Sequence, residues 1–348
     1  MPVSEARPIA RDRTAWCYPS GLVSAMDDRL LSRRATLDLL ALGSLDDVLA
    51  RVGQTLTLPR PPEATEPFEL AEAAEAGYAA ALRQLAKAAP SPALSDIFLL
   101  PIEWRAFRAY LHAEALGRER VRVPGAEVPD ATWAECWSSY DVEPPFDLFA
   151  AAAQALRKGT AREDLDEQII GEVTLAFEAR DVMRAARDAG GTGVPPVVIT
   201  WLRLRLALDL LRLRSLGWSH QSHEAALSAV GPARPSASGG GADGKDLLAL
   251  ATSDRADWRA SFTRLGLPEA ATIAEDDPSP AIAIERLIDN AVTRLAREGR
   301  YVPFGPEPVF AFLWALRIEA VNLRLVLSGL AAGMDADTIA KDLRDTYA

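Results

Sequence analysis

The feature of this 348-residue chain that most limits its fold is a short pattern that occurs three times at nearly equal intervals. In each copy an aliphatic residue precedes an acid, and a large apolar residue followed by arginine stands four positions after that acid. Self-similarity at a fixed period indicates a duplicated structural unit. The acids are 106 and 110 positions apart, so each repeat would fill about a third of the chain. The copies are Ile102-Glu103 with Phe107-Arg108, Leu208-Asp209 with Leu213-Arg214, and Ile318-Glu319 with Leu323-Arg324.

The sequence around these copies favours helices. Ala, Leu, Arg and Glu dominate, apolar residues recur at spacings of three and four, and no sustained alternation predicts strands. On a helix, an arginine five positions after an acid lies about 140° round the axis, which gives two polar edges separated by apolar faces. Such a helix must pack on more than one side. We therefore predict an all-α fold, although Leu45-Asp46 with Ala50-Arg51 nearly matches the pattern and leaves coincidence as the alternative.

Local signals suggest where helices begin and where repeats end. Ser44 and Asp335 each precede an acidic first turn and are predicted to be N-caps. The segment 231–245, GPARPSASGGGADGK, has almost no apolar bulk and predicts a flexible surface loop. The expected organisation is a helical repeat at 1–125, a second at 126–230, the inserted loop at 231–245 and a third repeat at 246–348.

Composition excludes several classes of protein. Forty-nine per cent hydrophobic and 25% charged residues are typical of a globular chain, and a net charge of -11 argues against a nucleic-acid binder. The longest apolar run, 308–330, is interrupted by charged and amide side chains, so membrane contact should go through a protein partner. Two cysteines, Cys17 and Cys136, favour a reducing cytoplasm and are expected to be small buried hydrophobes.

Catalytic and cofactor motifs are weak. The segment 239–246 resembles a phosphate-binding loop, but Asp246 stands where a magnesium-binding hydroxyl is needed and no buried strand precedes the glycines. His220 and His223 could share a helical face, but a metal site needs further ligands and the only other histidine is His112. We expect no enzyme active site, no cofactor and no metal.

The C-terminal run from Phe304 to Phe312, continuing through Arg317 to Arg324, resembles the last repeat of the C-type subunit of V/A-type ATPases, whose eukaryotic counterpart is the d-type subunit. The segments 100–111 and 208–216 are similar to weaker first and second repeats. Tyr18 and the residues up to Leu31 are similar to the opening helix of the family. Asn322 of the third copy is matched by Ala106 and Arg212, which leaves contact roles in the first two repeats open.

The resemblance implies a funnel-shaped helical body with pseudo-threefold symmetry. It also implies a non-catalytic rotor subunit on the cytoplasmic face of the membrane, which links central-stalk shaft subunits to the proteolipid ring and transmits torque for ion transport. The family motif is carried by Phe304, Gly305 and Pro306. The residues expected at partner contacts are Glu103, Arg108, Asp209, Arg214, Glu319, Asn322 and Arg324.

Two other functions fit the residues. The chain could be an unrelated all-α repeat scaffold or adaptor, which would not co-purify with stalk subunits and a proteolipid ring. It could also be an all-α enzyme in which Glu103, Asp209 and Glu319 converge as carboxylates. Glu319 and Asn322 lie on one side of an otherwise apolar helix, so we expect them either to pair with a neighbouring repeat or to face a shaft-receiving cavity.

Overall fold

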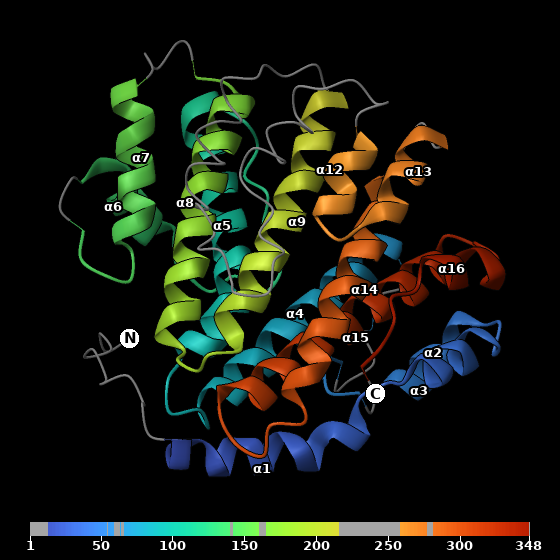
Figure 1. Ribbon diagram of the computed structural model, residues 1–348. Coiled ribbons are helices and arrows are strands. Elements are labelled where there is room, and N and C mark those ends of the chain that lie inside the picture. The colour runs from blue at the N-terminus through green and yellow to red at the C-terminus, as the bar shows by residue number, and fades with distance from the viewer. Residues whose placement is uncertain are drawn as a thin grey trace. The chain divides into compact units, whose positions relative to one another are not determined.

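The computed structural model describes residues 13–53, 55–58, 63, 66–139, 142–159, 165–215, 258–276 and 281–347. Over these residues the chain forms helices and no strand, which confirms the predicted all-α class (Figure 1). The chain divides into two compact units, one made of 1–99, 185–198 and 289–348 and the other of 100–184 and 199–288. The division into three repeats stays a prediction, and the 231–245 segment lies outside the described residues.

The helices are distributed over the two units as follows. The first unit contains two 3-10 turns, Arg13–Trp16 and Asp27–Arg29, and the helices α1 (Cys17–Met26), α2 (Arg33–Leu40), α3 (Leu45–Val52), α4 (Pro67–Ala86), α15 (Pro306–Ala331) and α16 (Ala336–Asp342). The second contains α6 (Asp130–Ser138), α7 (Asp147–Gly159), α12 (Trp258–Arg264) and α13 (Pro268–Asp276). Four helices contribute residues to both units: α5 (Ala93–Leu116), α8 (Glu167–Asp188), α9 (Val194–Ser215) and α14 (Ala281–Gly299).

Helix starts follow the predicted caps. The Ser44 hydroxyl accepts a hydrogen bond from the Asp47 amide at 3.4 Å, and α3 begins at the next residue. Asp335 Oδ1 accepts from the Thr338 amide at 2.9 Å at the start of α16. Each cap satisfies a backbone donor that has no partner inside the helix. Both N-cap predictions are therefore confirmed.

Helix α15 is the central element of the first unit. It packs along α4 and also contacts α1, α2, α3 and α16 (Figure 1). Every residue from Pro306 to Leu316 is buried. This confirms that the third copy of the pattern lies on a helix packed on more than one side. The adjoining core draws apolar side chains from α3, α4 and α16, among them Val48, Leu70 and Ile339.

An aromatic cluster forms the core of the second unit. Trp104 of α5 stacks on Phe149 of α7 with ring centroids 4.1 Å apart, and Phe107 and Trp133 pack against Phe149 as well. Helices α6 and α7 lie side by side in this unit (Figure 1). Large stacked and edge-on rings bury much apolar surface, so this cluster fixes the first copy of the pattern in place.

The two cysteines differ in their surroundings. Cys136 is fully buried and fits the prediction, and burial raises the pKa of its thiol to about 12. Cys17 is exposed, so the prediction for it was wrong. The reason is the orientation of α1, which buries Pro19, Ser20 and Val23 and leaves the Cys17 side chain facing outward.

Candidate functional site

Glu319, one of the predicted contact residues, lies in the interior of the first unit. Its Oε2 accepts a hydrogen bond from the Leu31 amide at 2.8 Å. Its Oε1 accepts from the Thr57 hydroxyl at 2.9 Å and from the Thr57 amide at 3.3 Å. Burial raises the pKa of this carboxyl, and these hydrogen bonds oppose the shift. The side chain thus ties two N-terminal segments to α15.

Asn322 acts in a similar way on the C-terminal segment. Its Nδ2 donates to the Arg344 carbonyl at 3.1 Å, and its Oδ1 accepts from the Arg344 amide at 2.8 Å. Arg344 is itself buried, and its Nε lies 3.3 Å from Oδ2 of Asp289, which also pairs with Arg317 at 2.8 Å. Glu319 pairs with segments of the predicted first repeat, as one of the two expectations had it. Asn322 pairs instead with Arg344 of its own predicted repeat.

Glu103, the matching acid of the first copy, is 9% exposed in the second unit. Its Oε1 accepts from the Glu127 amide at 3.0 Å, and its Oε2 lies 3.4 Å from the Val128 amide. Glu103 and Glu319 therefore both bind backbone amides of loops. A buried carboxylate is tolerated where such donors surround it.

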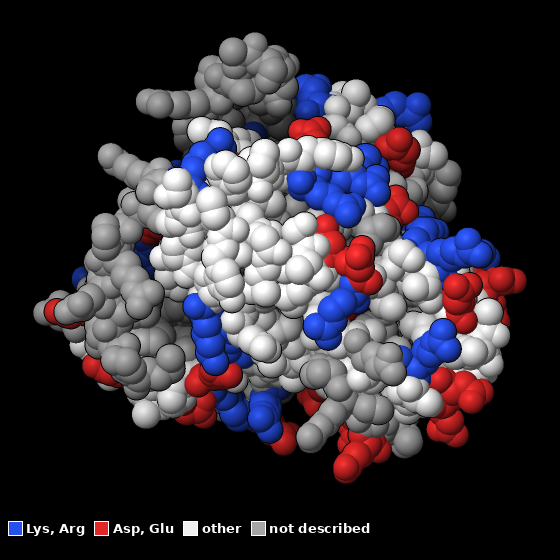
Figure 2. Space-filling view, turned by 90° about the horizontal axis from the view of Figure 1, so that it is seen from below, with Lys and Arg blue, Asp and Glu red and all other residues white. Residues whose placement is uncertain are grey.

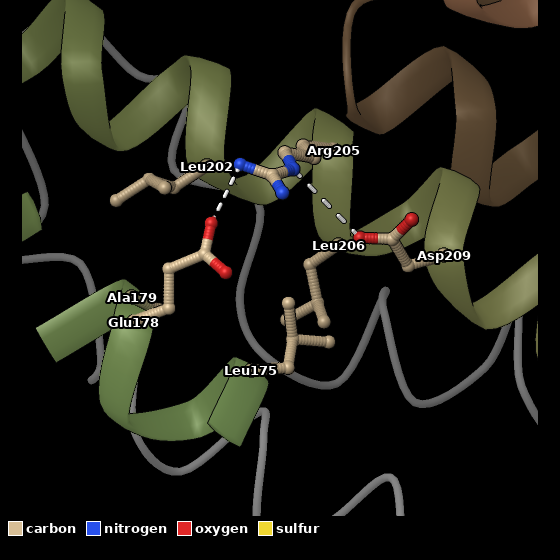
Figure 3. Close-up of a pocket in the computed structure, with 7 residues that line it drawn as sticks. All are labelled: Leu175, Glu178, Ala179, Leu202, Arg205, Leu206 and Asp209. Carbon is tan, nitrogen blue, oxygen red and sulfur yellow. Dashed lines mark ion pairs between the residues drawn. The ribbon is translucent and has the colours of Figure 1, made fainter. Parts of the chain in front are cut away.

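Arg108 and Asp209 belong to a charge network centred on Glu178, and Figure 3 shows the part of it formed by Glu178, Arg205 and Asp209. Glu178 is buried and forms ion pairs with Arg108 at 2.9 Å and with Arg205 at 2.8 Å. Burial alone would raise the pKa of Glu178, but the two arginines outweigh it and the pKa is lowered. Arg205 lies between Glu178 and Asp209, with Nε 3.9 Å from Asp209 Oδ2. Arg212 pairs with the same aspartate at 3.3 Å.

The cavity beside this network is small. Its volume of about 10 Å³ leaves room for about one water molecule. Apolar side chains, Leu175, Leu202 and Leu206, form the rest of its lining (Figure 3). The ion pairs connect α5, α8 and α9 within the second unit. The cavity beside them is too small for a ligand larger than water.

The remaining predicted residues are placed as follows. Arg214 lies in α9, but its side chain is outside the described part of the chain. Arg324 is partly exposed on α15 and makes no ion pair with a described residue. Phe304 is 44% exposed, whereas Gly305 and Pro306 are buried at the start of α15. Contact of any predicted residue with a partner stays a prediction.

The sequence analysis missed the role of Glu307 in the first unit. The amides of Thr192 and Gly193 donate to its Oε1 at 3.2 and 3.3 Å. A Cβ on Gly191, whose φ is +76°, would lie 2.7 Å from that oxygen, and a Cβ on Gly305, with φ +151°, would lie 2.5 Å from Oε2. The glycines are therefore required for the carboxylate to fit. The Gly190-Gly191-Thr192-Gly193 run was visible in the sequence, but its partner stands 114 positions beyond Gly193.

Helix α1 presents an uncharged surface. None of its ten residues carries a charge. Tyr18 is 69% exposed, and Tyr301 and Phe304 of the turn before α15 are also exposed. The Ser20 hydroxyl accepts from the Gly305 amide at 3.3 Å, which joins α1 to this turn. Figure 2, viewed from the side on which α1 lies in Figure 1, shows a broad area without charged side chains. We refer to Tyr18, Tyr301 and Phe304 as the uncharged face.

Within the described residues, no group of three or more His, Cys, Asp and Glu side chains is arranged to hold a metal ion. None of the helices described there combines the length and apolar character of a membrane span.

The comparison with known families is consistent with these features. A sequence model of the family described as ATP synthase (C/AC39) subunit matches residues 19–342. No curated protein sequence matches the chain. The matched range covers nearly the whole chain. It includes all three copies of the pattern and the glycines around Glu307. The chain therefore belongs to the C/AC39 subunit family of ATP synthases.

Proposed function

We propose that this chain is a non-catalytic rotor subunit of a V/A-type ATPase, which links the shaft of the central stalk to the proteolipid ring and transmits torque for ion transport. Family membership supports the assignment to a rotary ATPase. The observation that carries the finer proposal is the uncharged face, since exposed aromatic side chains on an uncharged helix and the turn joined to it favour contact with another protein.

The proteolipid ring is the partner that we assign to the uncharged face. Helix α1 is uncharged in a chain of which 25% is charged, so this contact would depend on aromatic packing and not on ion pairs. Contact through such a face would hold the subunit at the cytoplasmic side of the membrane. The shaft subunits would bind elsewhere on the chain.

The polar residues of the pattern support a non-catalytic role. Glu103 and Glu319 bind backbone amides, and Asp209 pairs with arginines. A general acid or base needs access to a substrate proton, which carboxyls held in this way do not offer. We propose that these acids, with Asn322, support the partner-binding surfaces from within, and that the more exposed Arg324 is the better candidate for direct contact.

Long-range ties within the first unit fit the transmission of torque. Glu319 binds Thr57 and Leu31, which stand 262 and 288 positions before it in the chain. The Tyr347 hydroxyl donates to Asp27 Oδ1 at 3.2 Å, across 320 positions. Internally cross-connected helices resist shear better than a flexible tether. An unrelated helical adaptor could have the same rigidity, so the partner must be tested directly.

The test is retention on the ring. The full chain, Tyr18→Glu and a control, Ile282→Glu, would be expressed with the stalk and ring subunits and purified from detergent-solubilised membranes. Ile282 is exposed on α14 in the second unit, so its replacement adds the same charge elsewhere. We expect Tyr18→Glu to reduce the amount of ring recovered, while Ile282→Glu leaves it unchanged. Equal recovery in all three would reject the uncharged face as the ring contact, and absence of ring and stalk from the wild-type preparation would favour the adaptor.

A further inference from the structure

A pocket in the second unit has a basic lining. Its volume is about 280 Å³, and its polar lining consists of Arg105, Arg108, His112, Arg118 and Glu119. Three arginines and one acid are among the lining residues, an excess of cations in a chain whose net charge is -11. An acidic protein that gathers cations around one concavity has a local potential opposite to its overall charge.

The backbone explains how these residues come together. Arg105, Arg108 and His112 are spaced by three and four residues and share one face of α5. Gly117, with φ +65°, ends the helix, and the Arg118 amide donates back to the His112 carbonyl at 3.3 Å. The Gly117 amide donates to the Ala113 carbonyl at 3.1 Å, which is the bond of an αL helix cap. It reverses the chain so that Arg118 lines the same pocket.

The ion pairs at the pocket differ in strength. Arg108 is held by the buried Glu178 at 2.9 Å. Arg118 pairs with Glu167 at 2.9 Å, but both side chains are more than half exposed. Exposed pairs of this kind contribute little to stability, because water and salt screen them. An anion entering the pocket could therefore bind Arg118 without breaking a costly internal contact.

His112 supplies a second, independent observation. Its imidazole lines the pocket, yet its Nε2 is buried and makes no hydrogen bond within the described residues. A buried polar nitrogen without a partner is uncommon and needs an explanation. A ligand oxygen that reaches the imidazole would provide the missing partner.

We propose that this pocket binds a small phosphate-type oxyanion, either inorganic phosphate or the phosphate monoester of a small metabolite. Guanidinium groups match phosphate oxygens in charge and geometry. Pockets for drug-sized ligands start at about 300 Å³, so a volume of about 280 Å³ suits a ligand smaller than a nucleotide. The site is separate from the uncharged face and does not depend on the proposed rotor function.

Titration calorimetry of the full chain with sodium phosphate and with glycerol 3-phosphate, at constant ionic strength, tests this proposal. The variant is Arg118→Gln, and the matched control is Arg122→Gln, which removes the same charge from an exposed residue of the same loop that does not line the pocket. We expect Arg118→Gln to weaken binding about tenfold, the loss typical of one charge-assisted hydrogen bond, and Arg122→Gln to change it little. Binding of one ligand alone identifies the source of the phosphate. Lack of binding by both, or equal weakening in both variants, overturns the proposal.

A second arm tests the imidazole with sulfate, which remains a dianion across the range used. Burial lowers the pKa of His112, with Glu167 raising it and Arg108 and Arg118 lowering it. A bound dianion favours the imidazolium, so sulfate should bind more tightly as pH falls from about 8 to about 6. His112→Gln should remove this dependence while circular dichroism verifies the fold. A wild-type affinity independent of pH would exclude His112 from the site.

Discussion

Glu319 in the first unit and Glu103 in the second occupy the same place in the repeated pattern, but they close very different spans of chain. Glu319 binds amides of Leu31 and Thr57, 288 and 262 positions away. Glu103 binds amides only 24 and 25 positions away. Glu319 is also the less exposed of the two, at 2% against 9%. In these two copies the acid is a buried acceptor for backbone amides, and the surrounding fold decides which segment supplies them. The acid of the other copy, Asp209, pairs with arginines instead.

The largest effect is expected at Glu319. Glu319→Ala leaves the Leu31 amide and both donors of Thr57 without an acceptor, and each unsatisfied buried group is costly. We expect the free energy of unfolding to fall by about 3 kcal/mol. Urea unfolding followed by circular dichroism measures it. A loss smaller than that of Glu103→Ala would break the comparison between the two acids.

Asn322→Leu should have the next largest effect. Leucine keeps a similar volume but removes both hydrogen bonds to the Arg344 backbone. The expected loss is about 2 kcal/mol in the free energy of unfolding. Binding of shaft subunits by the folded variant should remain unchanged, because the amide is buried. Reduced shaft binding at unchanged stability would instead place Asn322 at the partner contact.

Glu103→Ala should cost less, about 1 kcal/mol. Its carboxylate is more exposed, one of its contacts is 3.4 Å long, and the segment it holds is close in sequence. The same urea titration measures the change. Trp104→Ala, which removes a fully buried ring next to Glu103, serves as a positive control for damage to the second unit. Equal losses for Glu103→Ala and Glu319→Ala would mean that the length of chain closed has no influence.

A pH series separates the charge of Glu319 from its hydrogen bonds. Burial raises the pKa of this carboxyl above its ordinary value of 4.5, so the folded state holds the proton more strongly than the unfolded state does. The stabilisation is complete below that ordinary value and is lost as pH rises through the raised pKa. We expect the stability of the wild type relative to Glu319→Gln to fall as pH rises above the ordinary value of 4.5. A difference that grows with pH would mean that the amide donors lower the pKa instead.

The smallest effect is expected for the exposed pair of Arg33 and Asp345, whose side chains are 45% and 53% exposed and 2.9 Å apart. Asp345→Asn should change the free energy of unfolding by less than about 0.5 kcal/mol. The backbone amide at position 345 would keep its hydrogen bond to Asn290 Oδ1. A larger loss would show that charge at the surface of the first unit matters as much as its buried acceptors.

The parts of the fold that depend on neighbouring residues could be predicted from the sequence. The helical class and the caps at Ser44 and Asp335 depend on short segments, and their signals are local. The need of Glu319 for partners was also predictable, since a carboxylate on an apolar helix must be satisfied. Its actual partners were not, because no local signal connects it with Leu31.

Two buried carboxylates outside the pattern, Glu178 and Glu307, show the same limit. Glu178 is paired with arginines of α5 and α9. Glu307 lies against Gly191 and Gly193, which are distant in sequence, and against Gly305 just before it. In sequence, Glu178 resembles an ordinary surface acid of a charged helix, and Glu307 resembles an acid in the first turn of a helix. Their burial follows from how the helices of each unit pack, which spacing within one helix does not determine.

The length of chain between each acid and its amide donors also affects the order in which the protein can fold during translation. A ribosome delivers Leu31 long before Glu319, so the amides that this carboxylate binds must wait, solvated or held by a chaperone, for most of translation. Glu103 meets its amides within a few dozen residues, while the polypeptide is still emerging. Nascent chains arrested at successive lengths should therefore acquire protease resistance around α5 and α6 first, and near α1 to α3 only after α15 has left the exit tunnel.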